Sequence, residues 1–391
     1  MNTNDTTTIP QGYKTTPLGI IPQEWEVKRI KDFGSVITGC TPSTFDTENY
    51  GGSYMFVSPS DLSEGTKYIT TTEKRLTNKG FSQTRKIPKG SILFTCIGST
   101  IGKIGIASQD LATNQQINSV ITNDEYLFYA LSFQSDRIRI LANEQAVPII
   151  NKSDFEKIKV AFPPLEEQRK IAEVLGVWDE TIEKQARLVE KLALRKRGLM
   201  QRLLSAKLRL PGFSEKWEEL KINKIAKIKK GEQVNKNVLF SKAKYPVING
   251  GITPSGYLDT YNTKANTITI SEGGNSCGYV NFMTTPFWSG GHCYTIDVTD
   301  KINNLFIYQL LKHNEKYIMS LRVGSGLPNI QIKDIGNLKF MIPSYHEQTA
   351  IAKVLTAADR EIELAKEKLE RLRRQKRGLM QQLLTGKKRV K

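Results

Sequence analysis

Side chains that commonly carry out chemistry are few and dispersed in this 391-residue chain. The four cysteines form no C-x-x-C pair, which argues against a zinc ribbon or a redox-active dithiol. His292 adjoins Cys293, but no further ligand stands nearby to complete a metal site. We therefore expect no metal site and, in a chain of this length, no disulfide framework. The residues concerned are Cys40, Cys96, Cys277, Cys293, His292, His313 and His346.

Motifs of the common nucleotide and DNA enzymes are incomplete. The segment Gly98–Lys103 (GSTIGK) resembles a phosphate-binding loop, but it is one residue short and lacks the Ser or Thr after Lys103. The Pro163–Pro164 pair lacks the Asn or Asp that precedes it in adenine methyltransferases. Asp61 and Glu64 stand without the clustered acids and lysine of a metal-dependent nuclease. We predict no catalytic residue, and we interpret the glycine-rich segment as a turn.

The charge of the chain points to a polyanionic partner. Lysine and arginine number 57 against 39 acidic residues, a formal net charge of +18, and nucleic acid is the commonest partner for such an excess. Asn, Gln and Arg suit base edges and Lys suits phosphates, although any one such residue could equally be a solvated loop side chain. The candidate DNA contacts are Arg75, Lys79, Arg85, Lys103, Asn114, Gln115, Gln116, Lys242, Lys244, Asn249 and Asn275.

No window approaches the ~20 apolar residues of a membrane span. The polar residues Met1–Thr16 lack the apolar core of a signal peptide, so we expect a disordered lead-in and a cytoplasmic protein.

These candidates are positioned by a chain that repeats itself. Residues 163–207 and 343–387 align without a gap at an offset of 180, and 21 of the 45 pairs are identical. Both copies end in KRGLMQ-x-LL. A second match aligns Trp25 with Trp217 at an offset of 192, and Gly98 and Gly102 weakly match Gly274 and Gly278. The order is therefore globular, helical, globular, helical.

The globular segments, 17–162 and 208–342, are called here the first and second heads. Strand-like runs separated by turn signals precede a helical stretch in each head, which predicts two mixed α/β domains and an α+β chain. The runs are Tyr54–Ser58, Ser91–Ile97, Thr267–Ser271 and Tyr294–Val298, and the helical stretches are Glu125–Asn143 and about 304–319.

The helical segments carry apolar residues at alternating spacings of three and four, the heptad pattern of a coiled coil. Two amphipathic helices, each packed on its own head, would be the alternative. If the two helices pair, chain connectivity makes them antiparallel, in a pseudo-twofold arrangement about 58 Å long. The predicted seam comprises Leu175, Trp178, Ile182, Val189, Leu192, Leu199 and Leu203, then Leu355, Ile362, Leu369, Leu372, Leu379 and Leu383. Gln185, Lys196, Ala358, Ala365 and Lys376 occupy the remaining seam positions.

This layout resembles the specificity subunit of type I restriction–modification enzymes, the HsdS family. The blocks PPLEEQRKIAEVL and EQTAIAKVL, each followed by KRGLMQ-x-LL, carry the likeness together with Pro17–Gly39 and SILFTCIGSTIGKIG. The resemblance covers nearly the whole chain. It implies two target recognition domains, each reading one half of a bipartite asymmetric DNA site, separated by a long antiparallel two-helix coiled coil.

The resemblance also implies partners. Two modification subunits would dock on the repeated helices and methylate adenine with S-adenosylmethionine, and two motor-nuclease restriction subunits would use ATP and Mg²⁺. This chain would bind no cofactor of its own. Arg197 and Arg377 lie outside the seam and are candidate partner contacts. The KRGLMQ blocks could instead continue the seam or touch DNA phosphates, and residues 388–391 form a basic tail that we expect to be disordered.

Two other functions stay open at this point. A self-contained DNA-modifying or DNA-cleaving enzyme would need a motif that we do not find. A coiled-coil scaffold with incidental basicity would bind no DNA, or would bind it without dependence on salt.

Overall fold

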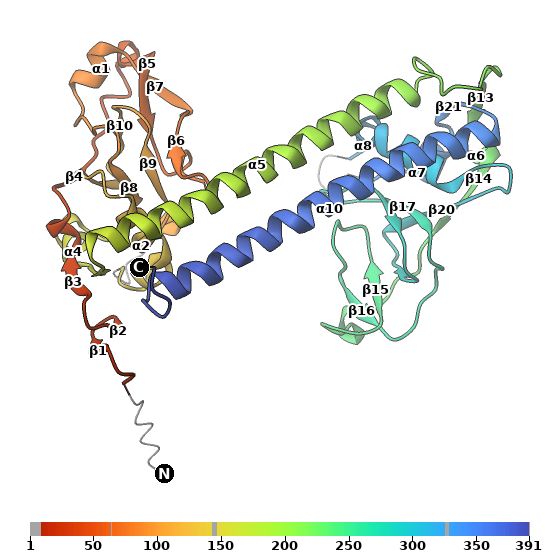
Figure 1. Ribbon diagram of the computed structural model, residues 1–391. Coiled ribbons are helices and arrows are strands. Elements are labelled where there is room, and N and C mark those ends of the chain that lie inside the picture. Colours follow the sequence, from red (N-terminus) through yellow and green to blue (C-terminus); the bar gives the residue numbers. More distant parts are fainter. Residues whose placement is uncertain (1–8, 64, 143–146, 325–327, 391) are drawn as a thin grey trace. The chain divides into compact units, whose positions relative to one another are not determined.

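The chain folds into two compact units in a computed structural model that describes residues 9–63, 65–142, 147–324 and 328–390. The first unit combines residues 1–187 with 366–391, and the second comprises residues 188–365. Two 39-residue helices, α5 (Leu165–Leu203) and α10 (Tyr345–Leu383), each begin in one unit and end in the other (Figure 1). Within the described residues, no helix has the apolar run needed to cross a membrane.

A mixed sheet forms the centre of the first head. Its order is β4-β11-β8-β9-β6, and its middle strand β8 is buried along its whole length. Side chains alternate between two cores: Ile92 and Phe94 enter the larger cluster, whereas Leu93 enters a smaller one on the other face. Burial on both faces explains why this strand reads as a continuous apolar run. The strands are β4 (Val36–Thr38), β6 (Tyr68–Ile69), β8 (Ile92–Thr95), β9 (Ile104–Ala107) and β11 (Ile117–Val120).

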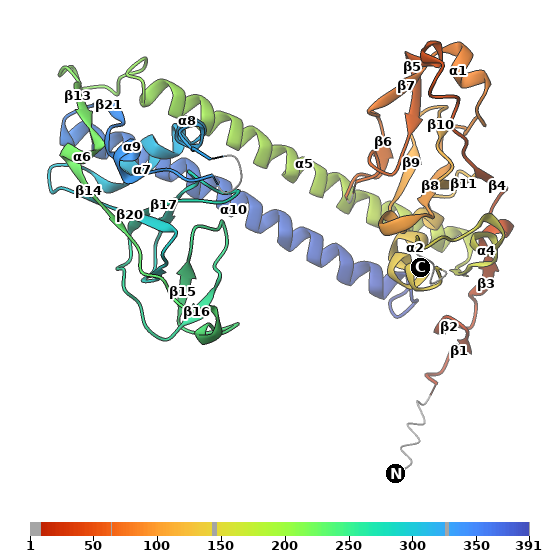
Figure 2. The same ribbon diagram turned by 180° about the vertical axis from the view of Figure 1, so that it is seen from behind.

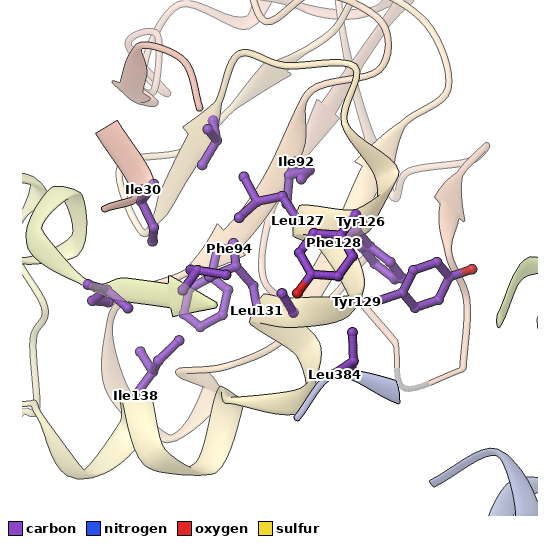
Figure 3. Packing of buried hydrophobic residues seen from close by; sticks show 14 of the residues in the cluster. Ile30, Ile92, Phe94, Tyr126, Leu127, Phe128, Tyr129, Leu131, Ile138 and Leu384 are labelled. Carbon is purple, nitrogen blue, oxygen red and sulfur yellow. The ribbon is translucent and has the colours of Figure 1, made fainter. Parts of the chain in front are cut away.

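The larger core joins the head to both long helices. Helix α2 (Glu125–Phe133) contributes six consecutive buried residues, and α3 (Ser135–Ile140) contributes Ile138. Ile171 from the start of α5 and Leu383 from the end of α10 belong to the same cluster. Figure 3 shows part of it, with Leu384 beside the side chains of α2. The predicted helix 125–143 is thus broken at Gln134, and Asn143 lies outside the described residues.

A smaller three-stranded sheet, called here the outer lobe, lies at the end of the first head away from α2 and α5 (Figures 1 and 2). Its central strand β5 pairs parallel with β10 and antiparallel with β7. Two further strand pairs, β1–β2 and β3–β12, lie outside these sheets. The elements are β5 (Tyr50–Val57), β7 (Lys74–Leu76), β10 (Ala112–Thr113), α1 (Asn78–Ser82), α4 (Lys152–Lys157), β1 (Tyr13–Thr16), β2 (Gly19–Pro22), β3 (Glu26–Arg29) and β12 (Lys159–Phe162), with short 3-10 turns at Ile30–Asp32, Thr47–Asn49 and Gly98–Thr100.

The second head repeats this order. A central sheet β14-β20-β17-β18 corresponds to β4-β11-β8-β9, and an outer lobe β16-β15-β19 again has one parallel and one antiparallel neighbour on its central strand. The elements are β13 (Glu218–Lys221), α6 (Ile222–Ile225), β14 (Ala226–Lys230), η4 (Lys236–Val238), β15 (Tyr245–Ile248), β16 (Gly256–Leu258), β17 (Thr267–Ser271), β18 (Val280–Met283), β19 (Trp288–Ser289), β20 (Cys293–Val298), α7 (Asn304–His313), α8 (Glu315–Ser320), α9 (Ile332–Gly336) and β21 (Lys339–Ile342).

The two long helices pair antiparallel within each unit. In the first unit Asp179 of α5 accepts from Lys376 of α10 and from Tyr129 of α2. In the second unit Asp359 of α10 accepts from Lys196 of α5 and from Gln309 of α7. Each residue of the first set is matched 180 positions away in the second. The predicted antiparallel coiled coil and the two mixed α/β domains are thus confirmed.

A buried tryptophan–glutamate–arginine junction ties each head to both helices. Trp25 donates to Glu167 at 2.9 Å, and Arg389 donates to both oxygens of that carboxylate at 2.7 and 2.8 Å. The second unit repeats the junction with Trp217, Arg209 and Glu347, which is fully buried: Trp217 donates at 3.0 Å, and Arg209 at 2.6 and 2.8 Å. The glutamate begins one helix and the arginine follows the end of the other, so each junction fixes three chain segments at one point.

Both chain ends differ from the sequence-based expectation. The tail at 388–391 is not free, because Arg389 is held by Glu167 and also pairs with Glu24, while Lys391 lies outside the described residues. The disordered lead-in was expected to reach Thr16, but Tyr13–Thr16 form β1. Tyr13 donates to the Gly386 carbonyl at 2.9 Å, whereas residues 1–8 lie outside the described part.

Replacement of Arg389 or Arg209 by methionine should destabilise the chain. Either change leaves a buried carboxylate without its cation, which costs roughly 3 kcal/mol of unfolding free energy. Urea denaturation of Arg389→Met and Arg209→Met measures the loss. Arg197→Met, an exposed arginine on α5, is the control and should stay within about 0.5 kcal/mol of the unmodified chain. Equal midpoints for all three variants would contradict a structural role for the junction.

Candidate nucleic-acid interface

Two of the predicted base-reading residues meet at one loop of the first head. Arg85 donates to the Thr38 carbonyl at 2.6 Å, and the Gln115 carbonyl oxygen accepts from the Thr41 hydroxyl at 2.6 Å. Both side chains are exposed. The contacts leave other guanidinium N–H groups of Arg85 and the side-chain amide N–H groups of Gln115 available as donors, the groups that suit base edges.

Other candidates in this head serve the fold. Asn114 accepts from the Gln116 backbone N–H at 3.1 Å and donates to the Gln116 side chain, an arrangement that shapes the turn before β11. Half-buried Lys103 donates to the Pro59 carbonyl at 3.0 Å, which differs from the exposed phosphate contact that we expected. Asp61 accepts backbone N–H groups of Ser58 and Glu73, and Glu64 lies outside the described residues.

Arg75 and Lys79 lie in the outer lobe and differ in availability. Arg75 is exposed, donates to the Ser53 carbonyl at 2.8 Å and lines a hollow of about 470 Å³ with Tyr50 and Lys74. Lys79 pairs with Glu48 at 2.6 Å and Asp46 at 2.9 Å. Hydrogen bonds to these carboxylates raise the pKa of Lys79, and its charge is locally neutralised. Of the two, Arg75 is better placed for an external anion.

In the second head the candidates divide in the same way. Lys242, Lys244 and Asn275 are exposed. Asn249 is half-buried and accepts the His292 backbone N–H at 3.1 Å, so its side-chain oxygen supports the turn that contains Gly290 and Gly291. The two lysines and Asn275 are therefore the accessible members of this set.

The glycine-rich segments of the two heads are structurally equivalent turns. Gly98 and Gly274 both have left-handed φ angles, 71° and 74°, and donate to the carbonyls of Pro148 and Pro328 at 2.8 and 3.0 Å. Because Pro148 and Pro328 are themselves 180 residues apart, the weak sequence match at these glycines is real. The Lys103 ammonium is engaged by the Pro59 carbonyl of the same head, so this segment is not a phosphate-binding loop.

The ends of three neighbouring strands of the central sheet form a corner that carries neutral side chains in the first head and charged ones in the second. The strands are β4, β8 and β11 in the first head, and β14, β17 and β20 in the second. In the first, Asn118 accepts from Thr38 at 2.6 Å and donates to the Cys96 sulfur at 3.2 Å. At the same places in the second, Glu272 accepts from Lys230 at 2.6 Å and from Tyr294 at 2.8 Å.

The equivalence of these corners follows from the backbone: Ile150 donates to the carbonyl of Cys96, and Ile330 to that of Glu272, both at 2.9 Å. Burial acts to raise the pKa of Glu272, but hydrogen bonds from Lys230 and Tyr294 outweigh it and hold the pKa below its ordinary value. The charged corner was not predicted, because only strand pairing brings its residues together.

The described residues contain no group of three metal-ligating side chains. Burial raises the pKa of Cys96 to about 12 and that of Cys293 to about 11, so both remain neutral thiols at physiological pH. All four cysteines are free, and Cys40 is the one that is not fully buried.

All predicted seam residues are buried or half-buried. The polar seam positions Lys196 and Lys376 are half-buried and carry the ion pairs between the helices. Arg197 and Arg377, next to them, are exposed.

Sequence reasoning missed the exposed aromatic residues of the outer lobes. Phe45 is 98% exposed in the first head, and Phe240 and Tyr261 are 54% and 51% exposed in the second. Aromatic residues ordinarily suggest a core, and nothing in their spacing marks these three as exceptions.

Comparisons with known proteins agree on one family. The family model described as the type I restriction modification DNA specificity domain matches residues 22–192 and again 214–374. Each match spans most of one head and most of the helix that follows it. The two matches therefore correspond to the two copies of the internal repeat.

Curated relatives share this description over nearly their whole length. The type I restriction enzyme MjaVIII specificity subunit of Methanocaldococcus jannaschii is 28% identical over 95% of this chain and 94% of its own. The MjaIX specificity subunit of the same organism is 30% identical over 85% and 86%.

A crystal structure of the type I restriction–modification S subunit from M. genitalium has the same fold, with a TM-score of 0.67 and 22% identity over 92% of this chain and 96% of that one. The repeated domain match and the near-complete coverage of the relatives lead to one assignment. The chain belongs to the family of type I restriction–modification DNA specificity subunits.

Proposed function

We propose that each head reads one half of a bipartite asymmetric DNA site, and that α5 and α10 set the gap between the halves. The observation that carries this proposal is the double match to a DNA specificity domain, at residues 22–192 and 214–374, because it assigns one recognition unit to each head. As a specificity subunit, the chain contributes recognition rather than catalysis. Its net charge of +18 is consistent with a double-stranded DNA partner.

The repeated helices are the proposed docking sites for two modification subunits. Equivalent exposed residues, such as Arg197 and Arg377, stand 180 positions apart on α5 and α10, which supports two equal docking surfaces. Two motor-nuclease restriction subunits would complete the assembly. In this proposal S-adenosylmethionine, ATP and Mg²⁺ belong to those partners, and adenine is methylated after it is flipped out of the duplex.

Replacement of Arg85 by alanine should weaken binding to the recognised site and relax specificity at one position of the first half-site. A lost bidentate base contact costs about 1–3 kcal/mol, or roughly 5- to 150-fold in affinity. Lys79→Ala is the matched control, because Glu48 and Asp46 already engage that lysine. Mapping of methylated adenines and binding to the mapped site provide the measurements. A loss for Lys79→Ala as large as that for Arg85→Ala would contradict the assignment of Arg85.

Insertion of one heptad into both helices should lengthen the recognised gap and leave both half-sites unchanged. Seven helical residues add about 10 Å while they keep the seam in register. Insertion of seven residues into α5 alone is the control. It breaks the pairing of α5 with α10 and should abolish methylation of the recognised site. Methylome sequencing reads out the site, and altered half-sites with an unchanged gap would count against the helices as the ruler.

A further inference from the structure

The two heads differ sharply in charge although they share a fold. Residues 17–162 contain 16 lysines and arginines against 15 acidic residues, whereas residues 208–342 contain 17 against 10. In the second head, residues 233–264 of the outer lobe hold three of the seven net positive charges. Between residues 233 and 264 there are four lysines and a single acidic residue, Asp259.

The lysines of this lobe lie on a segment that backbone hydrogen bonds hold in place. Lys236 begins η4, and Lys242 and Lys244 follow in the segment that leads to β15. That segment is fixed to β16, because Phe240 and Tyr257 exchange two backbone hydrogen bonds of 3.0 Å. All three lysines are exposed, and none has an ion pair among the described residues. We call Lys236, Lys242 and Lys244 the lysine patch.

Exposed aromatic side chains accompany the lysine patch. Phe240 lies between Lys236 and Lys242 in the chain, and Tyr261 packs edge-on against Tyr245 with ring centroids 4.9 Å apart. The Lys244 ammonium lies 5.2 Å from the Tyr245 ring centroid. Cations interleaved with exposed rings are typical of surfaces that contact the nucleic-acid backbone and sugars.

In the equivalent lobe of the first head two cations are paired with acids, whereas Lys74 and Arg75 have no ion pair among the described residues. Lys79 is shared between Asp46 and Glu48, and nearby Lys86 pairs with Asp110 at 2.7 Å. Glu73 adjoins Lys74 in the hollow beside Arg75. Phe45 stands fully exposed on a loop whose two carboxylates already hold Lys79. This lobe offers an apolar contact and hydrogen-bond donors but little net charge.

We propose that the lysine patch of the second head supplies most of the salt-dependent grip on the DNA backbone, and that the first head binds chiefly through non-ionic contacts. This proposal rests on the proposed DNA-reading function and adds that the two heads contribute unequally to ionic binding. Neutralised phosphates release counterions, so each contact contributes to the salt dependence of binding, whereas apolar contacts and hydrogen bonds to bases contribute little.

Two triple variants of the full chain test the proposal. One carries Lys236→Gln, Lys242→Gln and Lys244→Gln. Its matched control carries Lys74→Gln, Arg75→Gln and Lys79→Gln in the first head, and so removes the same three charges. Fluorescence anisotropy with a labelled random-sequence duplex, measured over a series of KCl concentrations, gives the slope of log affinity against log salt. Circular dichroism checks that both variants are folded.

The lysine-patch variant should reduce the magnitude of the slope by about 2 to 3, at roughly 0.9 per phosphate contact, and the control by less than about 1. Equal reductions, or a larger one for the first-head variant, would overturn the unequal division while leaving DNA binding intact. If the unmodified chain showed no salt-dependent binding, the proposed function itself would fail.

Discussion

The antiparallel register of α5 and α10 is the constraint on which the rest of the structure depends. A lysine in an apolar seam is costly unless an acid meets it, and in each unit the acid comes from the other helix. In the first unit both Lys376 and Asp179 have side chains only 16% exposed, so a slipped register would leave charges unpaired in a poorly hydrated place. The pair also reaches the head, since Tyr129 donates to Asp179.

Because the helical segment is duplicated, the same register also places an equivalent ion pair in each unit. Since Asp179 and Lys196 on α5 have counterparts Asp359 and Lys376 on α10, one pairing rule serves both units. The junctions of Glu167 and Glu347 repeat the rule at the helix ends, where each glutamate meets a tryptophan from its head. Each head is thus joined to the two long helices by the same junction at its base, whereas the outer lobes of the two heads differ in chemistry. The two outer lobes therefore share one strand arrangement but differ in net charge.

Much of this frame could be predicted from the sequence, because it depends on local periodicity and on repetition. The heptads and the 180-residue offset predicted the two helices, and chain connectivity predicted their direction. The strands Thr267–Ser271 and Tyr294–Val298 agree with β17 and β20 to within a residue. Long-range partners were beyond such reasoning: a tail rich in lysine and arginine gave no sign that Arg389 would lie on a buried glutamate 222 residues away.

Contact residues were the least predictable part for a related reason. Asn114 and Asn249 have the right chemistry for bases, but the fold uses both to shape turns. Lys79 and Lys242 look alike in sequence, and only the position of Asp46 and Glu48 separates them. Residue type indicates what a side chain could bind, whereas its neighbours in space decide whether it is available.

Exchange of residues 17–162 for the first head of another family member, with both long helices retained, tests the central claim most directly. Methylated adenines would be mapped in cells that also carry the modification subunit. The account predicts a new sequence in one half of the site, with the other half and the gap unchanged, because each head joins the frame through its own core and junction. A change in both halves or in the gap would contradict it.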